Sequence, residues 1–214
     1  MFNIKKFFRL NSLYTLIILN IIFFIVSSIL IFIKSETINY LALNPSNIFH
    51  KYYFWTLITS MFMHSGIFHL FVNMLSLFFI GNILIKILGE KRFVSLYLLS
   101  GIFSGIFFTL ISLIFPSEFN VYAVGASGAI FGLIGVLIFL TPNLPVYIMF
   151  VPVPIKMKYA APLMLIILWA ISLLGNIPIG NAAHLGGLLY GLIYGLYLTK
   201  KFKKKSLFIK NYFR

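Results

Sequence analysis

The sequence contains no cysteine and no aspartate, and its only acidic residues are Glu36, Glu90 and Glu118. Without cysteine, the chain has no disulfide, no thiolate nucleophile and no cysteine metal site. Without aspartate, it cannot build a Ser-His-Asp triad. Charged residues make up only 9% of the 214 positions, whereas about 25% is typical of soluble domains. These shortages point away from a soluble enzyme.

Apolar residues take the place of the missing charges. The chain is 61% hydrophobic, with a mean hydropathy of +1.05, whereas a soluble domain is about 45–50% apolar. These values are typical of an integral membrane protein. In a soluble protein, a net charge of +14 would favour binding to nucleic acid. Here, however, fifteen of the seventeen Lys and Arg residues lie before residue 10, at 86–92, at 156–158 or after residue 199. Membrane topology accounts for that clustering, so we expect no nucleic-acid partner.

Six apolar runs are suited to cross a bilayer, which predicts an all-α, polytopic membrane protein. Its spans are predicted at residues 13–33, 67–88, 93–115, 127–141, 160–174 and 183–198. With six spans both ends lie on one side, and the basic clusters make that side the cytoplasm. We therefore divide the chain into a cytoplasmic segment (1–12), a six-helix membrane domain (13–198) and a basic cytoplasmic tail (199–214), which attracts anionic lipid.

Three connecting segments carry their own signals. Residues 34–66 have polar ends and an aromatic middle, which predicts short, partly embedded helices. Residues 89–92 are predicted to form a charged turn. Prolines alternate with valines at 151–154, so an interfacial loop is expected there.

Ser127 lies in a run of small residues between Gly125 and Gly128. It is predicted to begin a helix, where free backbone N–H groups favour a negative charge, and this suits a nucleophile whose product is an oxyanion. A serine that only packs at a helix start is the alternative. The helix must end before Pro142, so it is about 21 Å long in a hydrocarbon core of about 30 Å. Ser127 is therefore expected below the membrane surface, in a wet or protein-lined site.

His184 directly follows the first residue of a second stripe of small residues at four-residue spacing, which consists of Ala183, Gly187, Gly191 and Gly195. Such stripes let membrane helices approach closely, and the matching stripe is Gly128 and Gly132. Docking the two would bring His184 beside Ser127, as a Ser-His dyad in which the histidine is the general base. We expect Phe131 to orient the ring. A histidine that only links two helices is the alternative.

His69 and Asn73 are four residues apart, so they share one helix face. With the Ser127 backbone N–H, they can donate hydrogen bonds to an oxyanion. His64 precedes His69 by five residues and is predicted to be a loop or cap contact. No His-x3-His pair with a nearby Glu is present, so a metalloprotease is disfavoured. No metal and no cofactor is expected.

Gly125-Ala126-Ser127-Gly128, His69-x3-Asn73 and Ala183-His184-x2-Gly187-x3-Gly191 resemble, in that order, the motifs of rhomboid intramembrane serine proteases over roughly residues 45–198. The resemblance implies a six-helix rhomboid-like bundle that cleaves transmembrane segments of other membrane proteins within the lipid bilayer. It implies that Ser127 is the nucleophile, His184 the base, and His69 with Asn73 the oxyanion-stabilising pair. His64, Phe131, Gly125, Gly128, Gly187 and Gly191 take supporting roles. Residues 175–182 would cap the site, and the fifth span would gate it.

The chain departs from the family pattern at three positions. Thr56 follows Trp55 where the family has arginine, Ile85 stands where a glutamate is usual, and Phe131 stands where tyrosine is frequent. All positions of the dyad and of the oxyanion pair match, so these departures bear on the scaffold more than on the chemistry.

Two other functions were weighed against proteolysis. An inactive relative that binds or escorts membrane clients usually lacks the serine or the histidine, and this chain keeps both. A transporter would show two repeated halves of its sequence or charged residues along a transport path, and this sequence has neither. The bias toward Ile, Lys, Asn and Phe suggests a bacterial plasma membrane.

Overall fold

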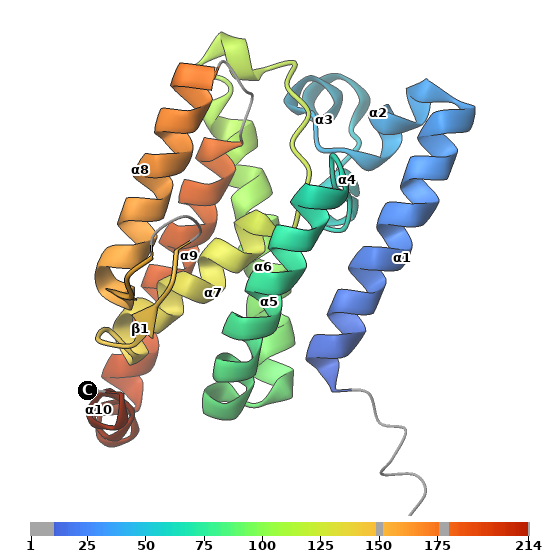
Figure 1. Ribbon diagram of the computed structural model, residues 1–214. Coiled ribbons are helices and arrows are strands. Elements are labelled where there is room, and N and C mark those ends of the chain that lie inside the picture. Colours follow the sequence, from blue (N-terminus) through green and yellow to red (C-terminus); the bar gives the residue numbers. More distant parts are fainter. Residues whose placement is uncertain (1–10, 149–151, 176–179, 214) are drawn as a thin grey trace, which may run out of the picture.

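The computed structural model describes residues 11–148, 152–175 and 180–213. Nearly all of its elements are helices (Figure 1). The N-terminal half holds α1 (Ser12–Ile33), η2 (Ser35–Thr37), α2 (Ile38–Leu41), α3 (Pro45–Lys51), α4 (Thr56–Thr59), α5 (Ile67–Leu88) and α6 (Glu90–Ile111). The C-terminal half holds η3 (Pro116–Glu118), α7 (Ser127–Leu140), β1 (Pro145–Val146), β2 (Ile155–Lys156), α8 (Met157–Gly175), α9 (Asn181–Lys201) and α10 (Lys203–Tyr212).

The predicted all-α membrane fold is confirmed. Within the described residues, α1, α5, α6 and α8 are each long and apolar enough to cross a membrane, and α7 is a shorter apolar helix. Each of the six predicted spans coincides with a helix, the sixth being α9. Figure 1 shows the start of α1 and the helix α10 at the same end of the bundle, which is the arrangement expected for an even number of spans.

The third predicted span is shifted. It was expected at 93–115 after a charged turn at 89–92, but α6 begins at Glu90 and ends at Ile111. A single non-helical residue, Gly89 with a φ of +80°, separates α5 from α6. An acidic residue in the first turn of a helix interacts favourably with the helix dipole, so Glu90 belongs to α6 despite its charge.

The helix α7 lies at the centre of the bundle and packs chiefly against α9 and α6. Eleven of its fourteen residues are buried. In Figure 1, α7 (yellow) starts about midway along α6, where the chain arrives from the top of the molecule as an extended segment. The first residue of α7 is therefore an interior position of the bundle.

The helix α1 lies at the edge and packs mainly on α5. A buried asparagine links it to α6, because Asn20 Nδ2 donates to Leu16 O at 2.8 Å and lies 3.4 Å from Tyr97 Oη. The asparagine Oδ1 has no hydrogen-bond partner. This contact stands apart from the small-residue interface between α7 and α9.

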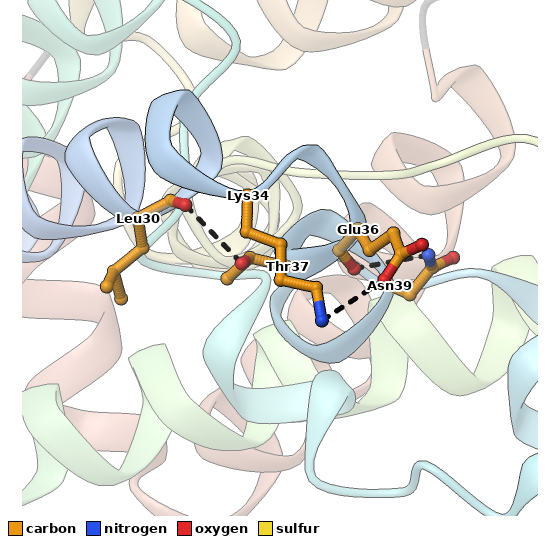
Figure 2. A network of polar contacts seen from close by, with 5 residues as sticks. All are labelled: Leu30, Lys34, Glu36, Thr37 and Asn39. Carbon is orange, nitrogen blue, oxygen red and sulfur yellow. Dashed lines mark hydrogen bonds and ion pairs between the residues drawn. The ribbon is translucent and has the colours of Figure 1, made fainter.

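Figure 2 shows how the chain turns after α1. Thr37 Oγ1 donates to Leu30 O at 3.4 Å, Asn39 Nδ2 donates to Glu36 O at 3.2 Å, and Lys34 Nζ lies 3.3 Å from Glu36 Oε2. Exposed ion pairs of this kind contribute only about 0–1 kcal/mol. The hydrogen bonds to backbone carbonyls therefore define this corner more than the charge pair does.

Residues 34–66 contain the short helices that were predicted there, η2, α2, α3 and α4. The predicted loop around the alternating prolines holds a small hairpin, since β1 pairs with β2 in antiparallel register; residues 149–151 lie outside the described part. The basic tail, for which the sequence analysis gives no secondary structure, contains α10, whose residues Ser206 and Ile209 are buried or partly buried against the bundle.

Candidate active site

An extended segment delivers Ser127 to the start of α7. Leu43 and Ala123 exchange two backbone hydrogen bonds, of 3.2 and 2.8 Å, and Gly125 N donates to Ser60 O at 2.9 Å. Gly125 has a φ of +121°, which side chains on L-residues rarely allow. Its missing side chain also leaves room for His69, whose Cε1 atom would lie 2.8 Å from a Cβ placed there.

The helices α7 and α9 lie in direct backbone contact. A Cβ atom on Gly187 would overlap the carbonyl oxygen of Gly128, and one on Gly191 would overlap the carbonyl oxygen of Gly132. Small residues allow this approach in a membrane, where packing rather than water exclusion holds helices together. The predicted docking of the two small-residue stripes is confirmed.

This docking brings Ser127 and His184 together. Ser127 Oγ lies 2.7 Å from His184 Nε2, within the range of a good hydrogen bond. The Phe131 ring stacks on the imidazole, with centroids 4.9 Å apart and planes 27° apart. His184 is buried, whereas Ser127 is half-buried. The packing of Phe131 on His184, predicted from helical spacing, is therefore observed.

His69 reaches the same site from α5, and its hydrogen bonds fix its tautomer. Its Nδ1 accepts from the backbone N–H of Ser65 at 3.4 Å and lies 3.0 Å from Ser65 Oγ. A nitrogen that accepts a backbone N–H carries no proton of its own, so the ring proton lies on Nε2. That Nε2 would lie 2.9 Å from a Cβ on Gly125. His69 thus points an N–H donor toward the segment that begins at Gly125.

Asn73 is buried one turn further along α5, and one of its amide hydrogens goes to His69 O at 2.8 Å. An amide has two hydrogens, so a second donor remains. The two residues share a face, as predicted.

His64 lies in the loop before α5, as predicted, and it also contacts a second histidine of the site. Its ring packs edge-on against the ring of His69, with centroids 5.2 Å apart. Both of its ring nitrogens are buried without a hydrogen-bond partner. Burial, together with His69, lowers the pKa of His64 to about 4, so the ring is neutral near pH 7.

Two serines of the site were not singled out from the sequence. Ser65 holds His69, as described above. Ser104 Oγ on α6 donates to Ala183 O at 2.6 Å, which fixes the chain directly before His184. Ser104 and Ser100, four residues apart on α6, also lie against Gly128 and Gly132. Their spacing matches the glycine stripes, and it is the signal that marks them.

The departures from the family pattern lie in the scaffold. Thr56 is fully buried, and its Oγ1 donates to Tyr53 O at 2.6 Å. Ile85 packs against the apolar core. The predicted cap at 175–182 lies largely in residues 176–179, outside the described part. Where the chain is described, no three potential metal ligands cluster.

Comparison with known proteins gives a consistent answer. Residues 51–201 match the family model described as "Rhomboid domain". "RHOMBOID-like protein 1" of Arabidopsis thaliana is 41% identical over 157 residues, covering 72% of this chain and 37% of that protein. "Rhomboid protein 1, mitochondrial" of Saccharomyces cerevisiae is 35% identical over 156 residues, covering 70% and 43%. "Inactive RHOMBOID-like protein 8" of Arabidopsis thaliana is 33% identical over 136 residues, covering 62% and 35%. The chain spans less than half the length of each of these relatives.

Proposed function

Since the chain belongs to the rhomboid family, we propose that it is an intramembrane serine endopeptidase. The observation that carries the proposal is the 2.7 Å contact between Ser127 Oγ and His184 Nε2 at the start of a buried helix. One relative is named inactive, so family membership alone does not decide between a protease and a silent relative. The paired serine and histidine favour the protease.

The dyad accounts for the steps of acyl transfer. His184 Nε2 takes the hydroxyl proton while Ser127 Oγ bonds to the substrate carbonyl carbon. The resulting imidazolium gives that proton to the leaving amine as the peptide C–N bond breaks, which leaves an acyl ester on Ser127. A water molecule then attacks the ester, with His184 again taking and returning the proton, and the serine is restored.

The oxyanion formed in each step requires donors that are already in position. The backbone N–H of Ser127, at the unpaired start of α7, is one of them. His69 Nε2–H and the second amide hydrogen of Asn73 are the others in this proposal. Donors of this kind each contribute about 10²–10³-fold to turnover in other serine proteases. None of them adds a permanent charge to a membrane interior.

The substrates in this proposal are transmembrane segments of other membrane proteins, presented within the bilayer. The depth of Ser127 in the bundle supports this class, because a soluble protein cannot reach it without unfolding a segment. The helix α8 is the proposed gate, and the loop 175–182 the proposed cap. The basic clusters support cytoplasmic termini, and the composition supports a bacterial plasma membrane.

The test is covalent labelling of the purified protein in detergent with a fluorescent fluorophosphonate. We expect wild type to be labelled and Ser127→Ala and His184→Ala to be unlabelled. Ser76→Ala, which removes another serine from an apolar helix, is the matched control and keeps full labelling. Size-exclusion chromatography and thermal melting verify that each variant is folded. A folded wild type that is not labelled and does not cut any transmembrane substrate would instead support the inactive relative.

A further inference from the structure

The two ring nitrogens of His184 have very different surroundings. Nε2 faces Ser127 Oγ at 2.7 Å, whereas Nδ1 is buried and has no hydrogen-bond partner. For Nε2 to accept the serine proton, the neutral ring must carry its own proton on Nδ1. That proton would then be a buried donor without an acceptor, which disfavours the reactive tautomer. The reactive tautomer therefore requires a hydrogen-bond acceptor for the Nδ1–H of His184.

In many serine proteases a carboxylate accepts the Nδ1–H of the catalytic histidine, but the carboxylates of this chain are engaged or placed elsewhere. The sequence has no aspartate, Glu36 pairs with Lys34, and Glu90 lies 3.3 Å from the backbone nitrogen of Ser12 at the far end of α6. Glu118 lies in η3, and in the described part of the chain no carboxylate is hydrogen-bonded to His184 Nδ1. The titratable side chains that face His184 are Ser127 on α7 and His69 on α5. Neither can accept the Nδ1 proton.

The matching acceptor lies one helical turn before His184. Asn181 is 8% exposed, and its Oδ1 is buried without a hydrogen-bond partner. Residues i and i+3 share a helix face, and side chains of a helix lean toward its N-terminus. The ring of His184 therefore leans toward the turn that holds Asn181. A buried donor and a buried acceptor thus remain unpaired on the same face of α9.

We propose that Asn181 is the positioning residue of His184, and that its Oδ1 accepts the Nδ1–H directly or across one water molecule. The contact selects the tautomer in which Nε2 is free to take the proton of Ser127. It also stabilises the Nδ1–H of the imidazolium that forms during attack. An amide does this without adding a charge, which suits a site in a membrane, where a carboxylate is expensive. This inference rests on the proposed protease function.

The test compares Asn181→Leu, Asn181→Asp and wild type in proteoliposomes that contain a fluorogenic transmembrane substrate. Leucine has a similar size but no acceptor, so we expect kcat to fall at least about tenfold with KM within about twofold. Aspartate restores the acceptor and favours the imidazolium, so we expect kcat to recover and the acidic limb of the pH profile to move to higher pH. A new carboxylate can move that limb by its charge alone, so the ring tautomer of wild type decides between the positioning role and a merely structural one.

Asn20→Leu is the matched control. Asn20 is a second buried asparagine whose Oδ1 lacks a partner, but it lies on α1 against Tyr97. Its kcat and pH profile should match those of wild type. If Asn181→Leu turns over as wild type does, or if Asn181→Asp leaves the pH profile in place, the proposed role of Asn181 is wrong.

A readout without activity separates this inference from the proposed function. In protein labelled with 15N-histidine, the signals of His184 are identified by their loss in His184→Ala. We expect the wild-type ring to carry its proton on Nδ1 and the Asn181→Leu ring to lose this preference. A proton on Nε2 in wild type overturns the role of Asn181, even if the enzyme is active. Absence of fluorophosphonate labelling, with the Nδ1–H tautomer present, counts against the protease alone.

Discussion

Replacing Gly187 with alanine tests whether the α7–α9 contact sets the geometry of the dyad. The added methyl would overlap the carbonyl oxygen of Gly128. This neighbour is backbone in the middle of a packed helix, so it cannot rotate away. Ordinary contacts between carbon and a carbonyl oxygen are about 3.3 Å or longer, so α7 and α9 must separate by on the order of 1 Å.

That separation acts directly on the contact between Ser127 and His184, because each residue begins or nearly begins one of the two helices. Their distance of 2.7 Å would grow to about 3.7 Å, outside the range of a hydrogen bond. A misplacement of about 1 Å costs on the order of 100-fold in rate, equivalent to about 2.7 kcal/mol in the barrier. We expect Gly187→Ala to lose about that factor in kcat and in the rate of fluorophosphonate labelling.

The same substitution is also expected to lower stability, since overpacking of a core typically costs about 1–3 kcal/mol. Melting curves in detergent therefore accompany the rate measurements. Gly180→Ala, at the N-cap of α9, is the control, because a Cβ there meets only ordinary contacts at 3.7 and 4.0 Å. If Gly187→Ala is labelled and turns over at the wild-type rate, the close approach of the two helices does not position the dyad.

Three further outcomes are expected. Ser65→Ala removes the side-chain contact to His69 Nδ1, so kcat should fall about tenfold at constant KM; an unchanged kcat would mean that Ser65 does not orient the ring. Because the folded-state pKa of His64 is lowered to about 4, its contribution to stability is complete above about pH 6.5 and falls by about 2–3 kcal/mol by pH 4.5. His64→Gln should melt with a shallower dependence on pH, and equal slopes would refute this. Replacing the lysines of 203–205 with glutamine should weaken the preference for phosphatidylglycerol over phosphatidylcholine in native mass spectrometry, whereas an unchanged preference would separate α10 from anionic lipid.

The sequence was sufficient to predict the arrangement of Ser127, His184 and Phe131, because glycine spacing constrains both the register and the distance of two helices. Each glycine stripe sets how closely the neighbouring helix can approach, and the glycines of the two helices face each other in only a few relative registers. The residues that support the dyad were harder to find. Ser65 acts from a loop, where no periodicity tells which way a side chain points. Asn181 falls in the predicted loop 175–182, whereas α9 begins at this residue, so its helix face could not be predicted.

Helix boundaries at the charged ends were also mispredicted, and for a common reason. Glu90 was predicted in a turn but begins α6, and the lysines after residue 202, assigned only to a tail, lie in α10. Charged residues indicate that a segment contacts water or lipid headgroups, but they do not indicate that the backbone stops being helical. Glutamate and lysine are in fact good helix formers.

The contrast between α1 and α7 explains why apolar content alone could not rank the helices. Both are almost wholly apolar, yet only four of the 22 residues of α1 are buried, against eleven of the 14 residues of α7. Lipid tails accept a large aliphatic side chain as readily as protein does, so hydrophobicity does not drive a membrane helix to the centre. What distinguishes α7 is its glycines, Gly128, Gly132 and Gly135, which bring neighbouring backbones close. The short length of α7 then follows from its place: a helix enclosed by others need not reach both membrane surfaces, and its polar start can lie in the interior of the bundle.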